Sequence, residues 1–60
     1  MRKLQRFDIV ETIQDARTYE MYTIKQGTKC MVAEDEKDTW IKVKVGLDYY
    51  LINRALLRLV

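Results

Sequence analysis

The sequence predicts an all-β domain, a small sheet of about five strands that closes on itself, with a short 3₁₀ turn near the C-terminus. Three observations favour this fold class. Residues 39–45 alternate between apolar and polar side chains, other apolar runs are rich in β-branched residues, and glycines stand between such runs. The alternation is the strongest of the three, because a strand places successive side chains on opposite faces.

The strand predicted at residues 39–45 has one β-branched face suited to a core. The members of that face are Thr39, Ile41, Val43 and Val45. The opposite face carries Trp40 together with Lys42 and Lys44. A large aromatic side chain on the polar face of a strand is the one local sign of a binding surface in this sequence.

Residues 4–16 are compatible with two structures. Apolar residues recur every three positions, as on a helix, which gives the alternative of an α+β fold with an N-terminal helix over residues 4–16. Within residues 7–13, however, several residues are β-branched, and Phe7, Ile9 and Ile13 fall on one side of a strand. No convincing N-cap precedes Leu4, so we favour a strand at residues 7–13.

The middle of the chain predicts a loop followed by a second hairpin strand. Residues 14–20 are polar apart from Tyr19 and predict an exposed loop, and residues 21–25 suit a short strand or turn before Gly27, which can adopt a positive φ. Residues 28–33 predict a strand. With Cys30 and Val32 facing inward, Lys29 and Met31 lie on the outer face.

The remaining elements follow from short polar connections. The acidic residues 34–38 have the length of a hairpin loop, which makes the strands on either side antiparallel neighbours. Residues 46–48 form the next turn and residues 49–52 the next strand. Residues 53–56 suit one 3₁₀ turn, after which residues 57–60 close the sheet.

Composition limits the class of protein. The 60 residues form a single domain, residues 1–60, with residues 1–6 as a candidate basic tail. One cysteine and no histidine argue against a disulfide framework, a zinc site and acid–base catalysis, so we expect no cofactor and no enzyme activity. No signal peptide or membrane-spanning run is present, which leads us to expect a cytoplasmic protein without a membrane partner.

Three segments resemble the SH3-type small β-barrel, including the bacterial SH3-like domains. Residues 20–28 are similar to the diverging turn of that family, residues 34–43 to its acidic loop followed by tryptophan and an alternating strand, and residues 50–56 to its terminal strand and 3₁₀ turn. The resemblance implies a barrel that binds protein ligands. Of the residues that line the family's groove for proline-rich peptides, only Trp40 has a counterpart here.

A protein-binding module is the function that these patterns favour. Trp40 projects from the polar face, Met31 is expected near it across the hairpin, and Tyr19, Lys42 and Lys44 are the further contact candidates. The alternative role for Trp40 is to cover the edge of the core. The orientations of the other tyrosines, Tyr22, Tyr49 and Tyr50, are left open by the sequence. The partner is unidentified, and homodimerisation through exposed strand edges is a further alternative.

Nucleic-acid binding is the second function class. Lys29, Trp40, Lys42 and Lys44 share the predicted outer face, where an aromatic ring can stack a base while ammonium groups meet phosphates. The net charge of +2 is too small to indicate such a partner by itself, and the acidic loop borders the same face. The size and architecture also suit a protein encoded by a phage or other mobile element that modulates a host protein.

Overall fold

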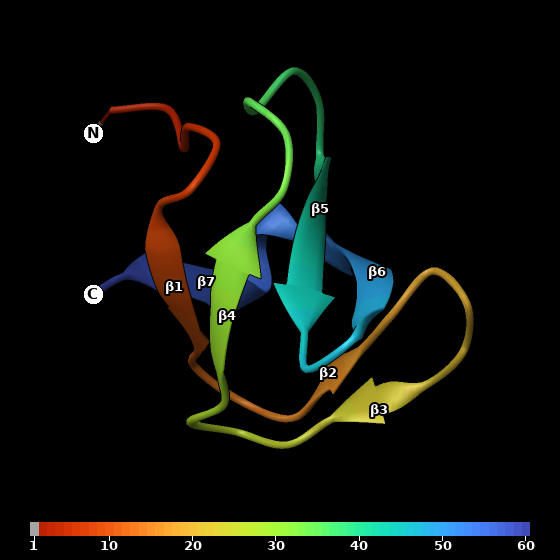
Figure 1. Cartoon of the computed structure of the whole chain (residues 1–60). Helices are drawn as coiled ribbons and strands as arrows, with labels where there is room; N and C mark the ends of the chain where they lie inside the picture. The colour runs from red at the N-terminus through yellow and green to blue at the C-terminus, as the bar shows by residue number, and fades with distance from the viewer. Residues whose placement is uncertain (1) are drawn as a thin grey trace.

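The computed structural model describes residues 2–60, which form a five-stranded antiparallel sheet and a separate two-stranded one. The large sheet has the strand order β6-β5-β4-β1-β7, and the small one pairs β2 with β3. In Figure 1 β1, β4 and β5 lie side by side in front, while β6 and β7 continue behind them. The elements are β1 (Ile9–Thr12), β2 (Ala16–Arg17), β3 (Thr23–Ile24), β4 (Lys29–Val32), β5 (Trp40–Val45), β6 (Asp48–Asn53), η1 (Arg54–Leu56) and β7 (Leu57–Leu59).

The all-β prediction is confirmed, and the alternative of a helix over residues 4–16 is wrong. β1 occupies the middle of that segment and pairs antiparallel with both β4 and β7. Its neighbours decide the matter, because pairing on both sides fixes this segment within the sheet, whereas an isolated helix of this length is only marginally stable in water. The inward side chains of β1 are Val10 and Thr12, whereas Phe7, Ile9 and Ile13 are exposed.

One hydrophobic core fills the space inside the curled sheet. The predicted inward residues Ile41 and Val43 of β5, and Cys30 and Val32 of β4, are all buried, and Val45 packs partly buried against them. The prediction was wrong for Thr39, which precedes β5 and is exposed. The hairpin between β4 and β5 and the turn at η1 are also as predicted. The complete core set is Leu4, Val10, Ala16, Ile24, Cys30, Val32, Ile41, Val43, Ile52 and Leu57.

The segment after β1 is less exposed than the sequence suggested. Residues 14–20 were expected to form an exposed loop, but β2 lies within them, and Ala16 and Thr18 are buried. Ala16 pairs with Ile24 across the β2–β3 hairpin, and this pairing turns its methyl group into the core. A small apolar or hydroxyl side chain gives little periodic signal, which is why the polar composition was misleading.

Residues 2–6 pack against the acidic loop. The Leu4 side chain is only 1% exposed, and its backbone N–H donates to Glu36 Oε1 at 2.8 Å while its carbonyl accepts from the Glu36 N–H. The Arg6 N–H donates to Asp35 Oδ1 at 2.8 Å. Carboxylates of the acidic loop therefore hold residues 2–6 of the predicted basic tail, and Leu4 completes the core. Residue 1 of that tail lies outside the described residues.

A tight turn connects this segment to β1. The Asp8 N–H donates to the Gln5 carbonyl, and Phe7 has a φ of 78°, a backbone conformation that favours glycine at this position of a turn. The Phe7 ring is 66% exposed, and the Arg6 guanidinium lies 5.0 Å from its centroid. Gly27 has a φ of 81°, as predicted for the turn before β4. Within residues 2–60 no helix is long enough and apolar enough to span a membrane.

Candidate functional site

Trp40 and Tyr19 come together at the end of the sheet next to the acidic loop. Trp40 begins β5, and Tyr19 lies in the turn between β2 and β3. Their rings meet edge to face, with centroids 5.4 Å apart and an interplanar angle of 81°. The Tyr19 N–H donates to the Leu51 carbonyl at 2.8 Å, which fixes the turn against β6. Since Trp40 is 37% and Tyr19 64% exposed, both rings remain available to a ligand.

The turn that carries Tyr19 is held by a buried threonine. Thr18 Oγ1 accepts from the Tyr22 N–H, and the Thr18 carbonyl accepts from the Met21 N–H, with Met21 at a φ of 70°. Glu20 Oε1 accepts a hydrogen bond from the Leu51 N–H. Partial desolvation disfavours its charge, but the hydrogen bonds from the amides of Leu51 and of Glu20 itself and from the Thr18 hydroxyl outweigh this, so the pKa of Glu20 is lowered. The turn therefore presents a fixed carboxylate.

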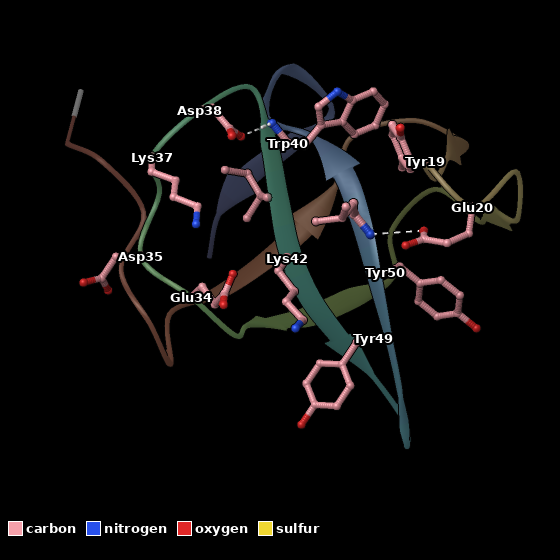
Figure 2. A pocket seen from close by; sticks show the side chains of 12 residues that line it. Tyr19, Glu20, Glu34, Asp35, Lys37, Asp38, Trp40, Lys42, Tyr49 and Tyr50 are labelled. Carbon is pink, nitrogen blue, oxygen red and sulfur yellow. Dashed lines mark hydrogen bonds between the residues drawn. The ribbon is translucent and has the colours of Figure 1, made fainter.

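Trp40 lies in an open groove of about 510 Å³ between the Tyr19 turn and the acidic loop (Figure 2). We name it the Trp40 groove. The strands β5 and β6 form its floor, the Tyr19 turn one wall and the loop before β5 the other. Its lining residues are Tyr19, Glu20, Glu34, Asp35, Lys37, Asp38, Trp40, Ile41, Lys42, Tyr49, Tyr50 and Leu51.

Negative charge dominates the Trp40 groove. Its lining contains four carboxylates, on Glu20, Glu34, Asp35 and Asp38, and two ammonium groups, on Lys37 and Lys42, a balance of −2. Three of the carboxylates accept backbone N–H donors: Glu20 from Leu51, Asp35 from Arg6 and Asp38 from Trp40. Such bonds orient a carboxylate, so the groove presents preorganised negative charge.

The structure places some predicted site residues in the groove and others elsewhere. Trp40, Tyr19 and Lys42 line it. Met31 does not lie near Trp40, contrary to the prediction, because the hairpin register puts Met31 opposite Lys44. Lys44 lies four residues from Trp40 on the same strand, about 13 Å at the usual rise of a strand.

Lys29 is also separated from Trp40. It lies opposite Glu11 on β1, whose carboxylate is bound by Arg58. The four residues named for nucleic-acid binding therefore do not converge on one point: Trp40, Lys42 and Lys44 follow one another along the same face of β5, and Lys29 lies apart from them. Antiparallel register alone decides this, because a strand's pattern does not say which of its residues stands opposite which.

The tyrosines that the sequence left open divide into two roles. Tyr50 packs against the core and stacks on Tyr22, with centroids 5.2 Å apart and planes 10° apart. Tyr49 points to the outer face, where the ammonium groups of Lys42 and Lys44 approach its ring. Sequence reasoning named none of the four acidic groove residues as contact candidates, and it also missed Leu51. An acidic residue beside Tyr19 in a turn was the only signal available for Glu20.

Chemistry at Cys30 is limited by its burial. Cys30 is only 3% exposed, and burial raises the pKa of its thiol. Little of the reactive thiolate therefore forms near neutral pH. The thiol donates a weak hydrogen bond to the Thr28 carbonyl oxygen, which lies 3.7 Å from Sγ. Within residues 2–60 no group of three His, Cys, Asp or Glu side chains is placed to hold a metal ion.

The fold and groove define a small all-β domain whose five-stranded sheet is compatible with an SH3-like barrel. In comparisons with known proteins, no family, curated protein or solved structure matches this chain.

Proposed function

We propose that the protein is a non-catalytic, SH3-like binding module that holds a segment of a partner protein in the Trp40 groove. The observation that carries the proposal is the edge-to-face pair of Trp40 and Tyr19 at one end of an open groove. Partly exposed aromatic rings that are fixed by their neighbours lose little entropy on binding, and such residues dominate the energetics of many protein interfaces.

The charge of the groove specifies the partner segment. Four carboxylates against two ammonium groups favour a segment that carries lysine or arginine beside an apolar side chain. The apolar side chain contacts Trp40 and Tyr19, and the cation lies near Glu34 and Asp35 on the loop. Electrostatic attraction of this kind raises the association rate and weakens as salt screens it.

The biological setting that we propose is the cytoplasm, with a protein of phage or other mobile-element origin acting on a host protein. The groove itself needs no catalytic step for such a role, since occupying a surface of the partner is enough to modulate it. The partner's identity then follows from the chemistry of the segment that the groove selects.

Selection of random peptides on the immobilised protein tests the proposed function. We expect enriched peptides to carry a basic residue next to an apolar or aromatic one. Trp40→Ala should weaken their binding by about 30-fold, the effect of losing an interface residue worth about 2 kcal/mol. Glu34→Gln should weaken binding less, and mainly at low salt, because Glu34 contributes only electrostatic attraction to the groove and salt screens it.

Matched variants separate binding from folding. Tyr19→Ala removes a ring that is 64% exposed and should also weaken binding, while Asp48→Asn changes a carboxylate outside the groove and should not. Circular dichroism of each variant verifies the fold. Enrichment of acidic peptides, or a well-folded Trp40→Ala protein that binds the selected peptides like the wild type, contradicts the proposal.

A further inference from the structure

Two lysine side chains converge on one tyrosine ring on the outer face of the sheet. Lys42 and Lys44 lie two residues apart on β5, and Tyr49 stands opposite Lys44 on β6. The Lys42 Nζ lies 5.4 Å and the Lys44 Nζ 5.8 Å from the centroid of the Tyr49 ring. Both lysines are half-buried, so their stems are held against the sheet. Within residues 2–60 neither ammonium group belongs to an ion pair.

This arrangement is suited to an anion. Two ammonium groups beside the same ring repel each other, and the negative face of the ring offsets only part of that repulsion. Phosphates bound beside the two ammonium groups would relieve this repulsion. The Tyr49 ring is 53% exposed, which leaves part of it open for a planar group to stack on.

The surface around Tyr49 differs in charge from the Trp40 end of the groove. Across the sheet from Lys44 the cross-strand neighbours are Met31 and then Ile9, and neither side chain is charged. Figure 2 shows Tyr49 at the opposite end of the view from Trp40 and Asp38, with Lys42 between them. A polyanion can therefore approach across the Tyr49 end of the face without passing over the acidic loop.

We propose that this face binds single-stranded nucleic acid, with an unpaired base stacked on Tyr49 and flanking phosphates held by Lys42 and Lys44. A duplex hides its bases from such a ring, and a second copy of this chain would bring like charges together. An acidic polypeptide would satisfy the two ammonium groups but has no need of the ring. The site is separate from the protein-binding role of Trp40, although Lys42 and Tyr49 also border the groove.

Fluorescence anisotropy with a labelled 15-nucleotide oligothymidylate tests the electrostatic part. We expect binding at low salt that weakens as salt rises. Each phosphate contact on a single strand contributes about 0.7 to the slope of log K against log salt. The double variant Lys42→Gln/Lys44→Gln should therefore lower the slope by about 1.4. Lys25→Gln, which removes an exposed ammonium group away from this face, is the control and should leave the slope unchanged.

Two substitutions at Tyr49 test the stacking part. Tyr49→Ala should weaken oligothymidylate binding by about 5- to 150-fold, the range reported by alanine substitution for stacking one base, while Tyr49→Phe keeps the ring and should bind like the wild type. Trp40→Ala should change this affinity by no more than about twofold, which distinguishes the face from the groove. These comparisons use variants whose circular dichroism matches that of the wild type.

Several results would overturn the proposal. One is the absence of oligothymidylate binding by the wild type at low salt. Another is equal competition by polyglutamate together with full binding by Tyr49→Ala, which would indicate an acidic protein surface instead. Stronger binding of a duplex of the same length, or displacement of the oligonucleotide by phosphatidylserine vesicles at lower concentration than by unlabelled strand, would likewise reject a single-strand site.

Discussion

Replacing Leu4 by alanine should remove a large part of the stability of this domain. The Leu4 side chain is 1% exposed and belongs to the central core, although it comes from the segment before β1. Burying a leucine side chain stabilises a protein by about 1.5–3 kcal/mol, and Leu→Ala in a core costs about 2–5 kcal/mol once the cavity is included. Residues 2–6 can relax toward the gap, so we expect about 2–3 kcal/mol.

That loss is large because a domain of this size has a total stability of about 3–5 kcal/mol. Urea unfolding followed by Trp40 fluorescence, and thermal unfolding followed by circular dichroism, measure it. For a domain of about 60–100 residues each kcal/mol lowers Tm by about 4–8 °C, so Leu4→Ala should lower Tm by about 10–20 °C.

Two controls define the result. Lys3→Ala changes an exposed neighbour and should stay within about 0.5 kcal/mol of the wild type, and Leu4→Met nearly conserves volume and should cost less than about 1.5 kcal/mol. If Leu4→Ala unfolds at the same urea concentration as Lys3→Ala, then residues 2–6 are a tail and the packing described above is wrong.

Two further predictions concern the turn at residues 5–8. Phe7→Gly should be more stable than Phe7→Ala by about 0.5–1 kcal/mol in urea unfolding. Both substitutions remove the ring, but only glycine adopts the φ of 78° without the left-handed penalty of about 1–2 kcal/mol, and the greater entropy of glycine in the unfolded chain offsets part of that gain. Equal stabilities of the two variants would argue against a strained turn. The hydrogen bonds from Arg2 and from the Gln5 amide hold the pKa of Asp8 below its usual range in the folded protein. The ionised Asp8 carboxylate therefore stabilises the fold fully above the unfolded pKa of about 3.9, and this stabilisation is lost as pH falls through the lower folded pKa. Asp8→Asn should therefore unfold more readily than the wild type at pH 7 and approach it at pH 2–3, and a difference independent of pH would show that the charge has no part in it.

Local patterns were sufficient for most of the strands. The alternation at residues 39–45 correctly predicted which side chains of β5 face the core, because side-chain direction on a strand depends only on position along it. The acidic loop, the glycine turn before β4 and the 3₁₀ turn at Arg54–Leu56 were predicted from turn chemistry that acts over a few residues. For the same reason the sequence was enough to place Trp40 on the outer side of β5.

The tertiary structure alone decided what lies next to Trp40. The sequence expected Met31 there, but the β4–β5 register puts Met31 beside Lys44, and the β2–β3 turn brings Tyr19 in its place. The tertiary structure also packs the basic residues 2–6 against the acidic loop, which buries the Leu4 side chain. Both outcomes depend on pairings between segments that are distant in the chain. The register of such pairings is set by contacts across the whole domain, and the hydrophobic pattern of either segment alone does not indicate it.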